Sequence, residues 1–250
     1  LVPSLTELLF DLGLADRLVG RTRFCVHPAP AAGEIASVGG TKEIDMARLL
    51  ELAPTHLLVN VDENPKEMAD AIAAEGIQVV VTHPLEVVDN RELYRLLGGL
   101  FGADAAAAGL EAAFDAAFDR LAAAARDWPA RRALYLIWRK PWMTVAPGTY
   151  IADMLNLANI ATYDIGDGLR YPEIEMSDAL LDAVDLVLFS TEPYPFAEKH
   201  LAAFHEAFPR HAAKARLIDA EMVSWYGSRA VSGLDYLAEF AQELDRDFRR

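Results

Sequence analysis

Aromatic and basic side chains gather in the segments that follow short apolar runs of this chain. The run "DLVLFS" ends at Ser190, and the next residues include two prolines, Tyr194 and Phe196. Because proline cannot continue a helix, we expect a stiff loop that presents its rings. Comparable loops carry three of the four tryptophans. The aromatic and basic residues of these loops are Phe24, Trp138, Trp142, Tyr171, Tyr194, Phe196, Trp225 and Tyr226, with Arg21, Arg23, Arg139, Lys140 and Arg229.

This combination of side chains suits the binding of a large, flat, partly apolar ligand. Aromatic rings cover apolar faces, and a few cations can meet a polar edge. Ligands of open parallel sheets bind beyond the carboxyl ends of the strands. We therefore expect the two halves of the chain to face each other across an aromatic cleft, with Phe24, Trp142 and Trp225 opposed and Arg229 at an acidic or amide edge of the ligand. The alternative for any single ring is that it only packs one half against the other.

Catalytic motifs are absent from the sequence. It has no G-x-S-x-G, no H-E-x-x-H and no glycine-rich phosphate loop, so we predict a binding protein and not an enzyme. His27, His83, Glu192 and Asp219 could converge as nitrogen and oxygen ligands of a zinc or manganese ion. Such sites favour more histidines than the two found after strands, so a direct metal-ion receptor remains the alternative and no residue is assigned as a metal ligand.

Composition limits the partners of the chain. A net charge of −15 disfavours nucleic acid and anionic membrane surfaces. No apolar run approaches the roughly 20 residues that span a bilayer, and the single cysteine, Cys25, excludes an internal disulfide framework. Leu1 and Val2 resemble the end of a strand entering a helix. We therefore expect that the natural N-terminus is missing, which leaves a signal peptide undecided.

Short apolar runs alternate with helical patterns along the chain. This alternation predicts an α/β fold with mainly parallel sheets. The predicted strands cover residues 55–61, 77–82, 133–138, 185–190 and 215–220, and the predicted helices include 44–53, 65–75, 149–158 and 197–207.

An internal repeat and a long helix define the expected domains. Residues 43–65 match residues 173–195 at a constant offset, which predicts two similar lobes. An alanine-rich pattern over 105–127, with Phe114 and Phe118 at helical spacing, predicts one rigid connecting helix and little hinge motion. The expected domains are an N-terminal lobe (1–102), a backbone helix (103–129) and a C-terminal lobe (130–250).

Several segments resemble one known family. "LVPSLTELLFDLGLADRLVGRT", "VGGTK", "IWRKPWMTVAPGTYIADML", "STEPYPF" and "SWYGSR" are similar to the helical-backbone (class III) substrate-binding proteins of ABC importers for vitamin B12, iron–siderophores and haem. Of these segments, "IWRKPWMT" and "SWYGSR" are most similar to cobalamin-binding members. The resemblance implies two lobes, one long helix and a metal chelate bound between the lobes. It also implies no intrinsic cofactor, a periplasmic or other extracytoplasmic location, a monomer, and a permease with its ATPase as partners.

The resemblance also assigns residues. It places Phe24, Trp142, Phe196, Trp225 and Arg229 at ligand-binding positions. Asp62 and Asn64 lie on the first-lobe loop that often carries a tryptophan in the family, and this loop has none. Trp138, Tyr194 and Tyr226 complete the predicted ligand-binding set. Asp45 and Glu198 are the predicted permease contacts. Ala47 stands where the family has its first-lobe glutamate, so a chelate-binding protein no longer coupled to transport is a further alternative.

Overall fold

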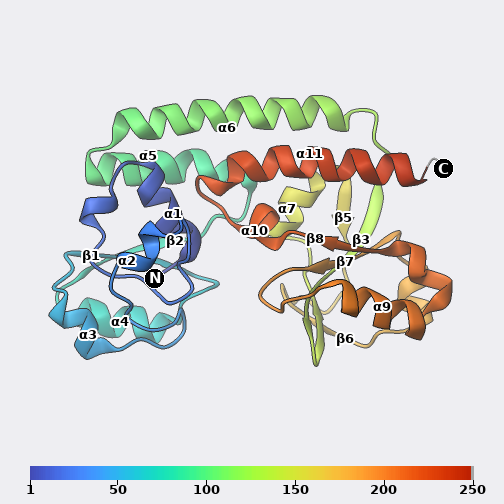
Figure 1. Cartoon of the computed structure of the whole chain (residues 1–250), viewed down its shortest axis with the longest axis horizontal. Helices are drawn as coiled ribbons and strands as arrows, with labels where there is room; N and C mark the ends of the chain where they lie inside the picture. Colours follow the sequence, from blue (N-terminus) through green and yellow to red (C-terminus); the bar gives the residue numbers. More distant parts are fainter. Residues whose placement is uncertain (249–250) are drawn as a thin grey trace. The chain divides into compact units, whose positions relative to one another are not determined.

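The computed structural model describes residues 1–248, which divide into two compact units. The first unit comprises residues 1–84, 88–114 and 226–229, and the second comprises 85–87, 115–225 and the described residues from 230 onward. Each unit has its own sheet, and among residues 1–248 no sheet runs through both (Figure 1). No helix of this described part combines the length and apolarity needed to cross a membrane.

The first unit is built on two parallel strands, β1 (His56–Asn60) and β2 (Gln78–Thr82). Helix α4 (Lys66–Ala74) supplies the crossover that parallel neighbours require. Its other helical segments are α1 (Pro3–Asp11), η1 (Ala15–Arg17), α2 (Ala31–Glu34), α3 (Met46–Glu51) and α5 (Asn90–Phe101), and η2 (Val87–Asp89) lies at the boundary between the units. Apolar side chains of these elements form the core of the unit, among them Val38, Leu49, Leu57, Val59, Ile72 and Ile77.

The second unit holds a six-stranded sheet in the order β6-β4-β3-β7-β8, with β5 paired to β3. The strands are β3 (Arg131–Arg139), β4 (Trp142–Thr144), β5 (Ile160–Thr162), β6 (Glu173–Ile174), β7 (Leu186–Ser190) and β8 (Ala215–Ile218). Strand β3 is parallel to β5 and β7, and β7 is parallel to β8. Strand β4 is antiparallel to β3, and β6 is antiparallel to β4. The predicted α/β class with mainly parallel sheets is confirmed.

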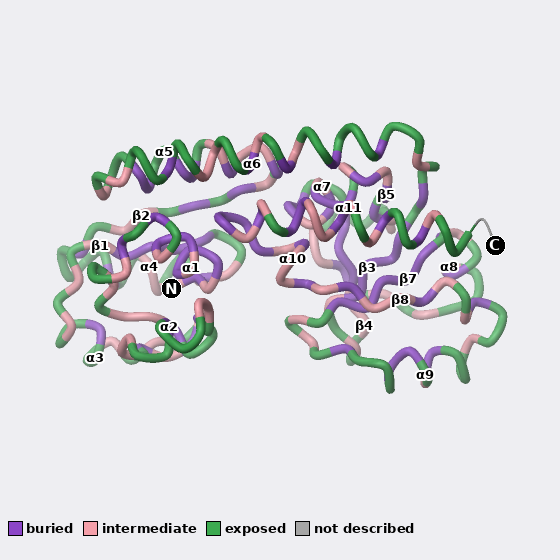
Figure 2. Tube along the Cα trace, turned by 45° about the horizontal axis from the view of Figure 1, so that its top comes forward, coloured by how far each residue is buried: buried purple, intermediate pink, exposed green. Residues whose placement is uncertain are grey.

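Helices cover this sheet on both faces. They are α7 (Tyr150–Asn156), α8 (Asp178–Asp182), α9 (Glu198–Ala207), η3 (Pro209–Lys214), α10 (Ala220–Ser224) and α11 (Arg229–Phe248). Every residue of β7 is buried, as Figure 2 shows for the central strands. A continuous apolar run such as "LVLF" is typical of a strand covered on both sides. Its neighbours in the core include Leu134, Leu136, Leu181, Phe196 and Phe204.

Each strand and helix predicted from the sequence has a counterpart in the structure. The five predicted strands correspond to β1, β2, β3, β7 and β8, and the four predicted helices correspond to α3, α4, α7 and α9. The sequence analysis did not find β4, β5 and β6, which have only three, three and two residues. Runs this short do not establish a period of two, so these strands form by pairing with neighbours: β4 and β5 pair with β3, and β6 pairs with β4.

Helix α6 (Asp104–Ala125) is the long helix that the alanine-rich pattern predicted. Its 22 residues extend about 33 Å at the usual helical rise. Ala107, Phe114, Ala117 and Leu121 are buried at helical spacing. Its residues up to Phe114 pack in the first unit and the following ones in the second, so the connection between the units is continuous helix. The proposed domain limits at residues 102 and 130 stay a prediction, because the units share this helix.

The internal repeat corresponds to equivalent elements. Shifted by the repeat offset, β1 coincides with β7 and α3 overlaps α8. Each of the two strands is followed by a matching backbone hydrogen bond to the next strand. The N–H of Val61 donates to the Thr82 carbonyl, and the N–H of Thr191 donates to the Ile218 carbonyl, both at 3.1 Å. The repeat therefore encodes one helix–strand–loop unit used twice.

Gly233 tests the packing of α11 against α10. A Cβ added at Gly233 would lie 2.1 Å from the Met222 carbonyl oxygen and 3.1 Å from Met154 Cε. We expect Gly233→Ala to lower the free energy of unfolding by about 2 kcal/mol or more, because backbone must move. Gly109→Ala is the matched control, since Gly109 is exposed on α6 and nothing lies within 4 Å of its Cβ position. The control should gain up to about 1 kcal/mol from helix propensity. Urea unfolding measures the free energy of unfolding of both variants. Equal values for Gly233→Ala and Gly109→Ala would contradict the close packing of α11 against α10.

Candidate functional site

The loop after β1 is held by its own amide side chains. Asn60 is buried at the end of β1, and its Oδ1 accepts from the N–H of Asp62 at 2.8 Å. Asn64 is also buried. Its Oδ1 accepts from the Asn60 N–H at 2.9 Å, and its Nδ2 donates to the Thr41 carbonyl at 2.8 Å. Of the two predicted residues here, Asn64 shapes the loop, and Asp62 is exposed, with Oδ1 3.6 Å from His83 Nε2.

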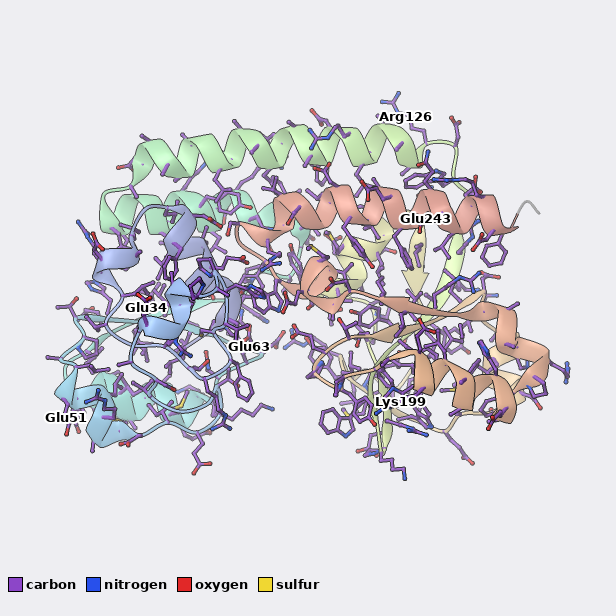
Figure 3. All side chains as sticks on the ribbon, in the orientation of Figure 1. Glu34, Glu51, Glu63, Arg126, Lys199 and Glu243 are labelled. Atoms are coloured by element: carbon purple, nitrogen blue, oxygen red, sulfur yellow. The ribbon has the colours of Figure 1, made fainter. Side chains whose placement is uncertain are left out.

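Glu63, which is labelled in Figure 3, lies on the same loop and anchors Tyr226. The Tyr226 hydroxyl donates to Glu63 Oε1 at 2.9 Å, and the ring is buried. Burial, followed by the charge of Glu63, raises the pKa of Tyr226 well above its usual value, so the phenol keeps its proton. The next residue is also fixed, since the Gly227 N–H donates to Asn90 Oδ1 at 2.6 Å and its carbonyl accepts from Tyr94 at 2.8 Å. Tyr226 thus belongs to a segment of the first unit that is held in place by side-chain hydrogen bonds.

Arg229 forms a two-pronged ion pair with Glu7 of α1. Its Nε donates to Glu7 Oε2 at 2.9 Å and its Nη2 donates to Glu7 Oε1 at 2.6 Å. The two side chains are only 12% and 15% exposed. Planar guanidinium and carboxylate groups match in this geometry, which strengthens both hydrogen bonds. A ligand edge that needs Arg229 therefore competes with a carboxylate already in place.

Phe24 presents its ring to solvent from a tight turn. Its side chain is 49% exposed, and the guanidinium carbon of Arg23 lies 4.9 Å from the ring centroid. The turn is fixed beneath it, because Thr22 and Cys25 are buried and their Oγ1 and Sγ atoms lie 3.2 Å apart. Phe24 is accordingly the predicted ring of the first unit that is available for contact.

Four predicted residues of the second unit come together in one aromatic cluster, made of Trp138, Trp142, Tyr194 and Phe196. Trp138 and Tyr194 meet edge to face at 5.5 Å between ring centroids, and Tyr194 lies 4.6 Å from Phe196. Trp142 stacks on Phe196 at 6.1 Å with an interplanar angle of 5°. Phe196 is buried and Trp138 is 39% exposed. The cluster thus extends from the buried Phe196 to the exposed indole of Trp138 at the end of β3.

Trp225 is buried and bonded to a carboxylate of the second unit. Its Nε1 donates to Glu192 Oε1 at 2.6 Å. The loop that carries Glu192 is held by Ser190, whose hydroxyl lies 2.8 Å from the carbonyls of Leu136 and Glu192. The buried Tyr135 lies close by, and burial, followed by the charge of Glu192, raises the pKa of its phenol.

Sequence reasoning missed the acidic anchors in these arrangements. Glu63, Glu192 and Glu7 hold Tyr226, Trp225 and Arg229, which the sequence analysis assigned directly to ligand. One signal was present, because the repeat aligns the acidic Asp62 with Glu192. No local pattern pairs Glu7 with Arg229, which lies 222 residues away.

The two predicted permease contacts stand at helix N-termini. Asp45 is exposed and caps α3, with Oδ1 accepting from the Arg48 N–H at 3.0 Å. Glu198 is exposed at the first position of α9. Carboxylates are favourable at these positions because they face the positive end of the helix dipole. Ala47, at the family's usual glutamate position, is exposed on α3.

The proposed direct metal site has no support in the arrangement of side chains. Within residues 1–248, no group of three or more His, Cys, Asp and Glu side chains is placed to hold a metal ion. His27 and His83 lie in the first unit, whereas Glu192 and Asp219 lie in the second. Asp219 instead caps α10, accepting from the Glu221 N–H at 3.0 Å.

Comparison with known proteins identifies the family. A family model described as periplasmic binding protein matches residues 1–219. The chain belongs to this family of binding proteins. Its role is binding, and the expectation that it is not an enzyme is confirmed.

A curated relative and two solved structures extend the likeness. The vitamin B12-binding protein of Photorhabdus laumondii is 31% identical over 84 residues, which cover 34% of this chain and 30% of that protein's length. The vitamin B12-binding protein BtuF of Vibrio cholerae superposes with a TM-score of 0.84 at 17% identity, over 97% of this chain and 95% of its own. The haem-binding protein RhuT of Roseiflexus gives 0.79 at 18% identity, over 96% and 97%. At these identities the two structures establish the helical-backbone fold.

The Arg229–Glu7 pair can be tested by its contribution to stability. We expect Arg229→Gln to lower the free energy of unfolding by about 3 kcal/mol, because Glu7 is left poorly solvated without its partner. Adding Glu7→Gln should recover part of this loss. The control is Arg120→Gln, since Arg120 pairs with Asp235 while 57% exposed and should lose less than about 1 kcal/mol. Denaturant unfolding that gives equal losses for Arg229→Gln and Arg120→Gln would show that the buried pair is not structural.

Proposed function

We propose that this chain is the substrate-binding component of an ABC importer for a metal chelate, with cobalamin or another corrinoid as the favoured ligand. The observation that carries the proposal is the exposed Trp138, which stands at the carboxyl end of β3 on a base of packed rings. Its ring packs edge to face on Tyr194 and its Nε1 donates to the Lys140 carbonyl at 3.2 Å, contacts that reduce the side-chain entropy lost when a ligand covers it. An exposed but rigid indole is the type of group that binds an apolar ring face.

The ligand class is supported by chemistry and by relatives. A corrinoid, haem or siderophore brings most of the metal's donors with it, so the protein needs apolar faces and a few polar contacts. The lack of a metal-holding group in residues 1–248 fits this division of labour better than a bare zinc or manganese ion. Two of the compared relatives bind vitamin B12 and one binds haem. Cobalamin is therefore preferred over haem and ferric siderophores.

The proposal includes the partners and location that the family implies. A permease with its ATPase would receive the ligand from a monomeric binding protein outside the cytoplasm. Asp45 and Glu198 are the proposed contacts, since both are exposed carboxylates at the starts of surface helices. Asp45 would take over the role of the glutamate that Ala47 replaces. A chelate-binding protein no longer coupled to transport remains the second candidate, and the exposed Ala47 favours it.

Ligand retention tests the proposed function. Purified protein is mixed with cyanocobalamin, hemin or ferric desferrioxamine, passed over a desalting column, and scanned for visible absorbance. We expect the cyanocobalamin spectrum to elute with the protein near one equivalent. Retained hemin, with a shifted Soret band, would move the assignment to haem. Elution of all three chelates free of protein, while zinc or manganese is retained, would overturn the chelate assignment.

Substitution of the exposed rings tests the residues. We expect Trp138→Ala and Phe24→Ala each to weaken binding of the retained chelate about 10- to 100-fold, because losing an aromatic contact costs about 1–3 kcal/mol. Their melting temperatures should change little, since both rings are substantially exposed. Trp128→Ala removes a tryptophan outside the strand-end loops and should leave affinity unchanged.

Trp225 provides the contrasting case. Trp225→Ala should lower the melting temperature, because it opens a cavity and leaves Glu192 without its indole donor. Calorimetric titration measures the loss of chelate affinity, and melting curves measure the loss of stability, so the two effects are separated. The residue assignment is wrong if Trp138→Ala and Phe24→Ala bind the chelate as tightly as the parent.

A further inference from the structure

The second unit carries a groove that the proposed chelate site does not use. It has a volume of about 680 Å³ and lies between the β3–β4 hairpin, the segment of β6 and helix α9. Apart from Trp142, none of its lining residues belongs to the predicted ligand-binding set, although Arg139 and Lys140 are among the basic residues of the strand-end loops. The lining residues are Arg139, Lys140, Pro141, Trp142, Ile174, Glu175, Met176, His200, Ala203, Phe204, Ala207 and Phe208.

The walls of the groove are mostly apolar. Trp142 and Phe208 are half-buried, and both line the groove. Ala203 and Ala207 lie one helical turn apart on α9, and their small side chains leave room above the helix. Such walls favour an aromatic or short aliphatic body in van der Waals contact. The volume falls in the range of small-molecule sites.

The rim of the groove is positive, in a chain whose net charge is −15. Arg139 and Lys140 line it, and Lys199 projects from the start of α9 (Figure 3). Among residues 1–248, the side chains of these three cations have no hydrogen-bond or ion-pair partner. Burial, and then the charges of Lys199 and Arg139, lower the pKa of His200, which lines the groove. Glu175 is the single acidic residue of the lining, and it is exposed.

We propose that this groove binds a small amphipathic anion, with a flat apolar body and one carboxylate. The body would lie against Trp142 and the two alanines of α9, and the carboxylate would meet Arg139 and Lys140. A guanidinium and a carboxylate match through two parallel hydrogen bonds, which a neutral amide cannot reproduce. The cations are unpaired within the described chain, so an anion gains their attraction without displacing an internal partner.

A charge series of one ring system tests the proposal. The probes are 2-naphthoate, 2-naphthamide and 2-naphthylmethylammonium, titrated against the whole chain by isothermal calorimetry at low salt. We expect 2-naphthoate to bind at least about tenfold more tightly than the amide, and the ammonium not to bind. Arg139→Gln should weaken 2-naphthoate about tenfold and leave the amide unchanged. Arg126→Gln, which makes the same charge change at the end of α6, should change neither affinity.

Groove-filling variants locate the binding site. Ala203→Leu should abolish 2-naphthoate binding, whereas Ala202→Leu, at an exposed position of α9 outside the lining, should preserve it. If the Ala203→Leu variant does not fold, the test uses Ala207→Leu in its place, since Ala207 is an exposed residue of the lining. Binding of 2-naphthoate that survives the filled groove would overturn the proposal, and so would equal affinity for the acid and the amide. Cyanocobalamin retention by the Ala203→Leu variant is measured in parallel, so that loss of the chelate site is not mistaken for loss of the groove.

Discussion

Parallel pairing of strands is the constraint on which the rest of each unit depends. Parallel neighbours cannot be joined by a tight turn, so each connection leaves the sheet, crosses a face as helix and returns. The carboxyl ends of β3, β7 and β8 therefore lie at one edge of the second sheet, and those of β1 and β2 lie at one edge of the first. Residues far apart in the chain become neighbours because of this geometry, as Trp138 meets Tyr194 and Glu192 meets Trp225.

Carboxylates stabilise the loops at these edges. Glu192 accepts from the Trp225 indole and Glu63 accepts from the Tyr226 hydroxyl, so each unit ties an aromatic of the segment 225–226 to its own strand-end loop. In the same way, Glu7 of α1 accepts from the Arg229 guanidinium. Burying such donors without acceptors would cost about 1–3 kcal/mol each. The aromatic and basic residues of "SWYGSR" thus stabilise the structure and are also candidates for ligand contact.

The rings of the aromatic cluster in the second unit differ in burial and therefore in role. Phe196 and Phe189 pack in the core, Trp142 covers them, and Tyr194 supports Trp138 at the surface. The rigidity of the outer ring comes from the inner ones, because a close-packed interior allows little side-chain motion. Trp142 also borders the cationic groove, so one ring connects the strand-end cluster with a second binding surface on the same unit. Binding proteins gain from this arrangement, since a preorganised surface loses less entropy when a ligand is bound.

The sequence alone determined the features that are local or periodic. The continuous apolar runs determined β1, β3 and β7, the alanine-rich pattern determined α6, and the repeat determined that one helix–strand–loop unit is used twice, because these properties depend on neighbouring residues. The short strands β4, β5 and β6 were not predicted, since β4 and β5 form only against β3, and β6 forms only against β4. Likewise, only the tertiary structure decided that Asn64 braces its loop, that Phe196 and Trp225 are buried, and that Glu7 meets Arg229. Burial and ion pairing depend on which residues the fold brings together across long stretches of chain, and no local pattern of side chains carries that information.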